Sequence, residues 1–351
     1  MEKDKIKGQG AVTNIHNHFI KNRYETSIYQ DDYEEEIAKT RVLEVFPKTI
    51  VNTVKSPDLS MAYSMNPYQG CEHGCAYCFA RPTHEYWGYS AGVDFERVIM
   101  AKKNAPQLLE KFFQKRGYKP EPILMSGNTD CYQPIERKLE ITRGLLQMCL
   151  DYRHPVHVLT KNALVTRDLD ILTKLAEKGL VSVSLSIPTI NEDLRRKLEP
   201  RTSSVTTKLK ALETLSKEGI PTHVMVAPMI PGLNTPEILP IVKTIAEMGA
   251  HDFGYTLVRL NDTVEPVFID WLEQHYPDRK DKVIHQISSM HGGKLGEKQV
   301  FKRRTGEGNI ADMIHTTFKI AKQKFFKDKE KMPPLAIHHF DGTRGEQLSL
   351  F

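Results

Sequence analysis

Three cysteines within eight residues are the feature of this sequence that most directly indicates chemistry. Cys71, Cys75 and Cys78 are spaced as C-x3-C-x2-C, and the whole chain has only 5 cysteines. Thiolates are soft ligands that suit iron, zinc or copper(I). Three thiolates on a four-iron cluster leave the fourth iron open for a further ligand. The spacing therefore predicts a metal centre on one short loop.

Two other interpretations use the same cysteines. A zinc site would combine the three thiolates with His73 or His84. Zinc loops usually carry paired C-x2-C motifs, and no second pair is present. A disulfide framework would leave one cysteine of the three unpaired, and the charged first residues lack the apolar segment of a secretory signal. The sequence therefore favours an iron–sulfur site in a cytoplasmic protein.

Several segments are similar to those of the radical S-adenosylmethionine (SAM) superfamily. Tyr77 is an aromatic residue directly before the last cysteine. The other similar segments are residues 66–70, 80–85, 128–136 and 159–161. They resemble the branch related to the spore photoproduct lyase, and the similarity runs from about residue 60 to about residue 260.

The resemblance implies that the three cysteines ligate a [4Fe-4S] cluster and that SAM chelates its open iron. An electron from a donor such as flavodoxin or ferredoxin would cleave SAM to methionine and a 5′-deoxyadenosyl radical, which removes a hydrogen atom from the substrate. The protein would orient these groups and exclude water. The branch implies a nucleic-acid substrate such as damaged DNA. The alternatives are a small metabolite, a protein side chain, or a non-catalytic redox sensor.

Short β-rich runs alternate with helical segments through the middle of the chain. The runs are residues 61–65, 122–126, 156–160, 181–187, 222–227 and 253–260. Between two of them, Leu169, Leu172 and Leu175 recur at helical spacing before Gly179, a typical end of a helix. This alternation predicts an α/β fold with a parallel sheet. Six units give a partial (β/α)6 TIM-type barrel, which the resemblance also implies, with the cysteine loop after its first strand.

We expect four regions along the chain. They are an N-terminal arm (1–59), a core barrel (60–262), a C-terminal helical extension (263–340) with helices at 264–276 and 309–326, and a tail (341–351). No run approaches the roughly 18 apolar residues of a membrane span, so no membrane partner is expected. The net charge of +5 is too small to indicate nucleic acid by itself.

Polar residues follow the second predicted strand. The resemblance places a comparable segment beside the ammonium group of SAM, which here implies Gly127, Asn128, Thr129 and Asp130. Small and polar residues at the end of a strand suit that contact. Asp130 could instead cap the next helix.

Basic and hydroxyl residues end the third and fourth strands. Lys161 and Arg201 could bind the carboxylate of SAM through charge-assisted hydrogen bonds, or form ordinary ion pairs. Ser184 and Ser186 lie on one face of the fourth strand, because side chains alternate along a strand. Two inward hydroxyls suit a polar pocket better than a barrel core.

The resemblance implies two apolar contacts with the adenine of SAM, from Tyr77 and from Ile230 after the fifth strand. A buried strand would leave the same pattern around Ile230. Cys131 lies in the region where the lyase carries a hydrogen-donating cysteine, so we predict it as a catalytic donor. However, the lyase cysteine aligns nearer Gly127. The alternative for Cys131 is a small buried apolar residue, as we expect for Cys149.

Two further features concern nucleic acid. A loop predicted near the open side of the barrel carries Lys294, Lys298, Lys302, Arg303 and Arg304, which either bind phosphates or lie in solvent.

The tail ends in Gln347-Leu348-Ser349-Leu350-Phe351, which resembles the motif that docks bacterial repair proteins on the DNA sliding clamp. Leu350 and Phe351 would be its apolar anchors. The alternative is that the tail packs on the chain's own core.

Overall fold

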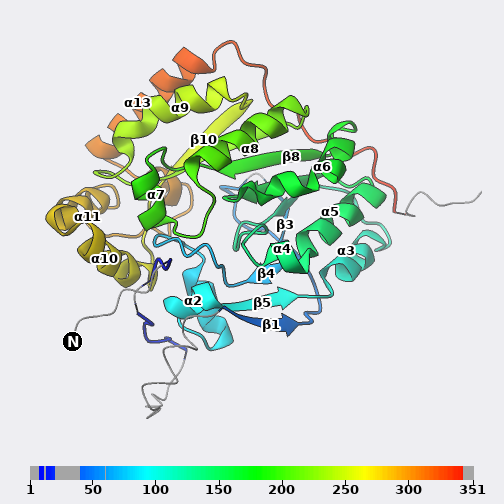
Figure 1. The fold of residues 1–351 in the computed structure, drawn as a ribbon, viewed down its shortest axis with the longest axis horizontal. Coiled ribbons are helices and arrows are strands. Elements are labelled where there is room, and N and C mark those ends of the chain that lie inside the picture. The colour runs from blue at the N-terminus through cyan, green and yellow to red at the C-terminus, as the bar shows by residue number, and fades with distance from the viewer. Residues whose placement is uncertain (1–7, 12, 20–39, 60, 343–351) are drawn as a thin grey trace, which may run out of the picture.

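An open seven-stranded sheet forms the centre of the computed structural model, which describes residues 8–11, 13–19, 40–59 and 61–342 (Figure 1). The strand order is β10-β9-β8-β7-β6-β3-β2. The strands are β2 (Val51–Thr53), β3 (Tyr63–Met65), β6 (Ile123–Met125), β7 (Val156–Thr160), β8 (Val181–Ser186), β9 (Thr222–Met229) and β10 (Asp252–Leu257). All neighbours are parallel except the edge strand β2. The predicted partial (β/α)6 barrel is confirmed.

The two faces of the sheet differ in polarity. Along β8, Val181, Val183 and Leu185 belong to the main hydrophobic core together with helix residues. The alternate residue Ser184 instead bonds through its hydroxyl to histidines on the neighbouring strands β7 and β9. Ser186 lies on the same face as Ser184, as the period of two predicts. The inner face of the barrel is therefore polar.

Six helices form an arc outside the sheet (Figure 1). They are α3 (Ala105–Phe113), α5 (Ile141–Asp151), α6 (Leu169–Ala176), α8 (Val205–Lys217), α9 (Ile238–Glu247) and α13 (Asn309–Phe325). Each presents buried apolar residues to the main core. Phe318 of α13 stacks on Tyr255 of β10 with ring centroids 3.8 Å apart. Part of the predicted C-terminal extension therefore belongs to the barrel's own helix layer.

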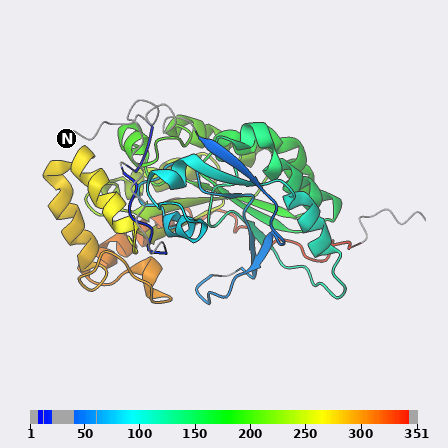
Figure 2. The same ribbon diagram turned by 90° about the horizontal axis from the view of Figure 1, so that it is seen from below.

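A second, three-stranded sheet was not predicted. Its order is β1 (Arg41–Val45), β5 (Val98–Lys102) and β4 (Tyr68–Gln69). Strands β1 and β5 appear in blue and cyan beside the main sheet in Figure 2. Because β4 ends just before Cys71, this sheet supports the start of the cysteine loop.

Helices α10 (Val264–His275) and α11 (Lys280–Ser289) lie at one end of the molecule, at the left of both views. Helices α10 and α13 begin where expected and each ends one residue early, whereas α11 was not predicted. The short helices are η1 (Arg81–Trp87), α2 (Val93–Arg97), α4 (Glu136–Leu139), η2 (Ala163–Asp168), α7 (Glu192–Leu198), η3 (Thr235–Glu237), η4 (Pro277–Arg279) and α12 (Lys302–Thr305). Within the described ranges, no helix has the length and apolar character to span a membrane.

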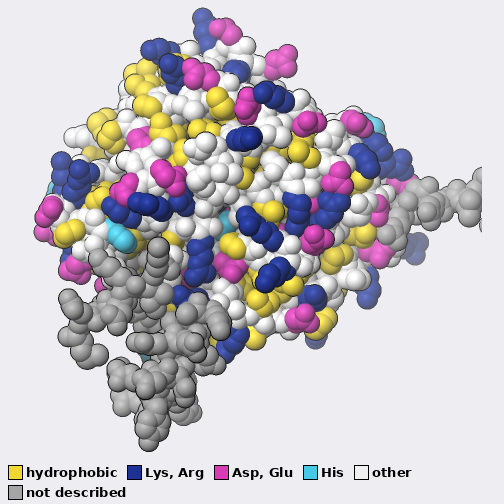
Figure 3. Space-filling model, in the orientation of Figure 1, with side chains coloured by type: hydrophobic (Ala, Val, Ile, Leu, Met, Phe, Trp, Pro, Cys, Tyr) yellow, Lys and Arg dark blue, Asp and Glu magenta, His cyan; other side chains and the backbone are white. Residues whose placement is uncertain are grey.

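Surface charge is mixed on the face shown in Figure 3. Lysine and arginine side chains alternate with aspartate and glutamate over most of this face. The net charge of +5 is thus not gathered there into one basic patch.

His154 is a buried neutral histidine between α5 and β7. Its ring stacks on Phe113 at 4.3 Å, and its nitrogens contact the Tyr118 hydroxyl at 2.8 Å and the Pro155 carbonyl at 2.9 Å. The carbonyl only accepts, so Nδ1 donates to it and Nε2 accepts from Tyr118. Burial lowers the pKa of His154 to about 3.

This pKa predicts acid sensitivity. Below its ordinary pKa of about 6.5, His154 takes up a proton in the unfolded chain but not in the folded one, so stability falls as the pH falls toward 3. By linkage the loss at pH 5 is about 2 kcal/mol. We expect His154→Phe to lower the free energy of unfolding at pH 7 and to remove about 2 kcal/mol of its change between pH 7 and pH 5. Urea unfolding at both pH values measures this, and an unchanged pH dependence would contradict it.

Candidate functional site

The cysteine loop lies where the carboxyl ends of several barrel strands meet. Cys71 and Cys75 are buried and Cys78 is half-buried, and all three are free thiols. Burial raises the pKa of Cys75 well above its usual range. Nearby negative groups, which include the other two thiols, add to this effect. Bound iron would supply the positive charge that stabilises such thiolates. The donor set therefore fits an iron–sulfur cluster.

Among the residues that the structure describes, the side chains around the cysteine loop are not arranged to bind a single metal ion such as zinc. Over the described part of the chain, no three His, Cys, Asp or Glu side chains are placed to hold one metal ion. The thiolates of a [4Fe-4S] cluster bind different irons, so they need not converge on one point. The histidines considered for zinc have other surroundings. His73 Nδ1 lies 3.3 Å from Asp130 Oδ2, and His84 packs between the rings of Tyr89 and Phe95.

The Arg81 side chain stabilises the cysteine loop through hydrogen bonds to its backbone. Its side chain is fully buried, and its Nε and Nη2 donate to the Cys75 carbonyl at 3.1 and 2.9 Å. Nη1 donates to the carbonyls of Ala91 and Gly92, and Nη2 also pairs with Glu96. Sequence reasoning assigned Arg81 no role. The available signal was its place in the family-like segment 80–85, three residues after the last cysteine.

The described part of the N-terminal arm packs on the same loop. The backbone N–H groups of Gly10 and Ala11 donate to Glu96 at 3.1 and 2.7 Å. A Cβ added at Gly10 would lie 1.7 Å from the Gly74 carbonyl oxygen, so only glycine permits this approach. Glu96 therefore joins the arm, Arg81 and the cysteine loop.

The polar segment after β6 is braced against the residues before the cysteines. Gly127 has a φ of +98°. The N–H groups of Asn128 and Thr129 donate to Asn66 Oδ1 at 3.0 and 3.3 Å, and the Thr129 hydroxyl donates to the Tyr68 carbonyl at 2.8 Å. The structure thus places this segment beside the cysteine loop. Its contact with the ammonium of SAM stays a prediction.

Asp130 connects the ends of β6 and β7. Its carboxylate accepts from Tyr132 N–H at 2.8 Å, the Thr160 hydroxyl at 2.7 Å and Lys161 N–H at 2.7 Å. Burial raises the pKa of Asp130, but the adjacent His73 lowers it by more. The net result is a pKa of about 2. No helix begins beside Asp130, and α4 starts at Glu136 with Ile135 as its cap. The alternative role as a helix cap is therefore wrong.

Lys161 brings a positive charge to the centre of the site. Its Nζ donates to Ser186 Oγ at 3.1 Å. Burial lowers the pKa of Lys161, but Glu199, Cys75 and other negative groups raise it by more, so the net shift is upward. An ammonium group facing the cysteine loop suits the carboxylate of SAM. That contact stays a prediction, like the one assigned to Ser186.

Glu199 is a buried carboxylate that sequence reasoning missed. It pairs with Lys208 Nζ at 2.7 Å and accepts a hydrogen bond from the Tyr77 hydroxyl. Burial raises the pKa of Glu199, but Lys208 and Lys161 lower it by more. Glu199 and Lys208 showed no pattern in the sequence. The hydrogen bond from its hydroxyl to Glu199 thus fixes the orientation of Tyr77, which is predicted to lie near the adenine.

Two other predicted residues lie at the edges of this region. Arg201 Nε donates to the Gly8 carbonyl at 2.9 Å, so its side chain reaches the N-terminal arm. Ile230 is fully buried in the same hydrophobic cluster as Cys75 and Tyr77. Their contacts with SAM stay predictions.

Cys131 and Ser184 face different environments. Cys131 is fully buried in the main hydrophobic core, with Sγ 3.8 Å from the Leu159 carbonyl oxygen. This position is typical of the alternative interpretation, a small buried residue, and the donor role stays a prediction. Ser184 Oγ contacts His157 Nε2 at 2.9 Å and His223 Nδ1 at 3.1 Å inside the barrel.

The basic loop is partly neutralised within the chain. Lys298 pairs with Asp262 at 2.7 Å, Lys302 with Glu307 at 2.6 Å, and Arg303 with Asp58. The loop is therefore not a uniformly free cationic patch. The last five residues, proposed to dock on a clamp, lie outside the described residues.

Comparisons with known proteins agree with this geometry. The open barrel carries three free thiols on one loop, a donor set that fits an iron–sulfur cluster. The family model of the radical SAM superfamily matches residues 65–245, and the chain belongs to this superfamily. An uncharacterized protein of Methanocaldococcus jannaschii is 30% identical over 251 residues, 72% of this chain and 90% of the relative. One of Mycobacterium tuberculosis is 30% identical over 241 residues, 67% of this chain and 70% of the relative.

Solved structures show the same fold. A variant of spore photoproduct lyase superposes with a TM-score of 0.61 at 18% identity, covering 92% of this chain and 89% of the lyase. The lyase complexed with dinucleoside spore photoproduct superposes with a TM-score of 0.58 at 16% identity, covering 88% of this chain and 86% of the lyase.

A further relative was found by sequence. A radical SAM Nalpha-GlyT isomerase of Pseudomonas phage M6 is 24% identical over 66% of this chain and 46% of that protein. Because the family model matches about half of the chain, the chain is a radical SAM enzyme, a class that uses a [4Fe-4S] cluster and SAM.

Proposed function

We propose that Cys71, Cys75 and Cys78 hold a [4Fe-4S] cluster and that the enzyme removes a hydrogen atom from a nucleic-acid substrate, such as damaged DNA. One observation supports this reaction most directly. In a member of this superfamily, three free thiols lie next to the carboxyl ends of β6, β7 and β9. When bound, the cluster supplies the electron that cleaves SAM to a 5′-deoxyadenosyl radical.

The chain's own residues would orient SAM around this loop. Lys161 and Ser186 lie together and offer an ammonium and a hydroxyl to its carboxylate. The braced segment 127–130 lies beside the loop at the carboxyl end of β6, the neighbour of β7, where it would receive the ammonium. Ile230 and Tyr77, from one apolar cluster, would pack on the adenine. Arg201 would add a second cation for the carboxylate.

The substrate class is supported by the relatives and by the barrel interior. Spore photoproduct lyase, whose fold matches almost the whole chain, has been solved with a dinucleoside photoproduct. The inner face here carries hydrogen-bonding groups, among them Ser182, Ser184, His157 and His223. Burial lowers the pKa of His157 to about 4, so it stays neutral and can both donate and accept. Such groups suit a nucleoside better than an apolar substrate.

Isotope transfer tests this proposal. The reconstituted enzyme is reduced anaerobically with SAM and oligonucleotides that carry deuterated sugars or thymine methyl groups, either intact or ultraviolet-irradiated. We expect deuterium in 5′-deoxyadenosine from at least one of them. Transfer only from a small metabolite or a peptide would overturn the nucleic-acid assignment. Absence of any SAM cleavage by a fully loaded cluster would favour a redox sensor.

The tail proposal is tested separately. If residues 347–351 dock on the bacterial sliding clamp, a peptide ending in them should bind the purified clamp with a dissociation constant in the range of tens of micromolar or tighter, on the order of −6 kcal/mol or stronger. Changing Leu350 and Phe351 to alanine removes the two apolar anchors and should abolish binding. Equal binding of both peptides, or of neither, would contradict the docking role. Flavodoxin or ferredoxin stays the proposed electron donor.

A further inference from the structure

A surplus of positive charge lies between the two edges of the open barrel. Asp58 belongs to the loop between β2 and β3 at one edge, and Arg259 lies two residues after the end of β10 at the other. Arg303 binds the Asp58 carboxylate through two nitrogens, with Nε 2.7 Å from Oδ2. Arg304 Nη1 donates to the Asp58 backbone carbonyl at 2.9 Å. Contacts from α12 therefore bridge the open side of the barrel.

The charges in this cluster do not balance. Arg303 pairs with the Asp58 carboxylate, Arg304 bonds only to the Asp58 backbone carbonyl, and Arg259 interacts with Asp58 only through its charge. Burial lowers the pKa of Arg259, and the charges of Arg303 and Arg304 lower it further against the opposing effect of Asp58. The neighbouring acids Asp262 and Glu307 are already paired with lysines. Like charges held together are stabilised by an anionic ligand.

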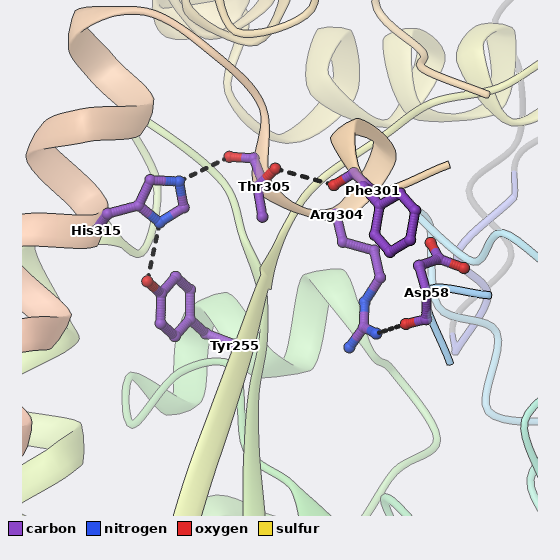
Figure 4. Close-up of a pocket in the computed structure, with 6 residues that line it drawn as sticks. All are labelled: Asp58, Tyr255, Phe301, Arg304, Thr305 and His315. Atoms are coloured by element: carbon purple, nitrogen blue, oxygen red, sulfur yellow. Dashed lines mark hydrogen bonds between the residues drawn. The ribbon is translucent and has the colours of Figure 1, made fainter. Parts of the chain in front are cut away.

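A cavity of about 440 Å³ opens beside the cluster (Figure 4). It is lined by Asp58, Tyr255, Phe301, Arg304, Thr305 and His315. Tyr255 and Thr305 are both bonded to His315, at 2.9 Å each, which fixes the back of the cavity. This volume lies in the range of ligand pockets, roughly 300–1,000 Å³.

Phe301 stands exposed at this cavity on a strained backbone. Its side chain is 64% exposed, and its φ and ψ are +70° and −40°. A bulky residue rarely adopts a positive φ, and such strain persists where the surrounding structure enforces it, often at binding sites. An exposed aromatic ring beside a guanidinium group is the arrangement that stacks an unpaired base next to its phosphate.

The cluster also connects to the cysteine loop. The Arg259 guanidinium lies 5.5 Å from the ring centroid of Phe79, which follows Cys78 and is 54% exposed. Exposed aromatic rings therefore lie at both ends of the arginine cluster, Phe79 near the cysteines and Phe301 at the cavity. An acidic peptide would need the arginines but not these rings.

We propose that Arg259, Arg304, Phe79 and Phe301 form a strand-binding track that holds single-stranded or locally unpaired nucleic acid, with a base on Phe301 and phosphates on the two arginines. This inference rests on the proposed function and adds how the substrate is held. Arg303 is a positioning residue, because its pair with Asp58 fixes α12 against the β2–β3 loop.

The test is direct binding of a fluorescein-labelled twelve-nucleotide thymidine strand to the reconstituted full-length enzyme, measured by anisotropy over a salt series. Arg304→Gln should weaken binding about tenfold and reduce the salt slope by about one. Phe301→Gly should also weaken binding about tenfold through lost stacking. Because glycine accepts a positive φ, it should not lower the melting temperature, which separates binding from folding.

Matched controls remove the same groups elsewhere. Arg196 on α7 is 69% exposed in its pair with Asp193, and Phe46 is 69% exposed, so Arg196→Gln and Phe46→Ala should bind like the wild type. Equal binding by wild type, Arg304→Gln and Phe301→Gly would overturn the track. If deuterium transfer from oligonucleotides persists, the proposed function still stands. Two further results would overturn the track. One is failure of the wild type to bind the strand at low salt. The other is binding of a labelled oligoglutamate peptide that the Arg304 and Phe301 variants weaken to the same extent.

Discussion

The Cys71→Ala, Cys75→Ala and Cys78→Ala variants are each expected to lose the iron–sulfur cluster and all cleavage of SAM. Removing one of three thiolates leaves an iron without its protein ligand, and the remaining two cannot hold the cluster open toward SAM. Anaerobically purified wild type should be brown with about four irons and four sulfides per chain. Each variant should be colourless, with no 5′-deoxyadenosine released under dithionite.

Cys149→Ala is the matched control for this loss. Cys149 is a free, fully buried cysteine on α5 in the main core, away from the loop. Its truncation should cost stability but retain the cluster and SAM cleavage. A colourless wild-type protein with stoichiometric zinc, or full iron content in the three variants, would contradict the assigned ligands.

Arg81→Met is expected to lower the free energy of unfolding by about 3–5 kcal/mol, because it leaves the buried Glu96 carboxylate without its cation. Both side chains are fully buried in the wild type. The variant also removes two donors from the Cys75 carbonyl, so its iron content should fall. Chemical unfolding of the apoprotein and iron analysis after reconstitution measure the two effects separately.

Two controls sharpen this prediction. Arg81→Met combined with Glu96→Leu removes both charges and should recover part of the stability, since an uncompensated charge is the main cost. Arg196→Met breaks an exposed pair with Asp193 and should change stability by less than about 1 kcal/mol. If Arg81→Met unfolds like the Arg196 variant, Arg81 does not hold the loop.

Sequence alone predicted the barrel well because its signals are local. The fourth predicted strand, residues 181–187, corresponds to β8 (Val181–Ser186), whose alternating valines and serines specify one apolar and one polar face. Similarly, α13 was expected at 309–326 and is observed at Asn309–Phe325. The cysteine spacing is also local, and it indicated the class of cofactor before any fold was known.

The second sheet was not predicted because its partners are distant and short. Strand β1 pairs with β5, with Arg41 opposite Val98, and β4 has only two residues. A two-residue strand has no periodicity to detect. The same reason hid Arg81, Glu96, Glu199 and Lys208, since each acquires its role from a partner in another element.

The basic loop shows the division between sequence and tertiary structure. Its five lysines and arginines are evident in the sequence, and they determined that positive charge would lie after the last strand. Only the fold decided which charges are available. It pairs Lys298 and Lys302 with nearby acids, and it brings Arg303 and Arg304 to Asp58 and Arg259 from the opposite edge of the barrel. Electrostatic partners are set by distance in space, which no local pattern in the sequence encodes.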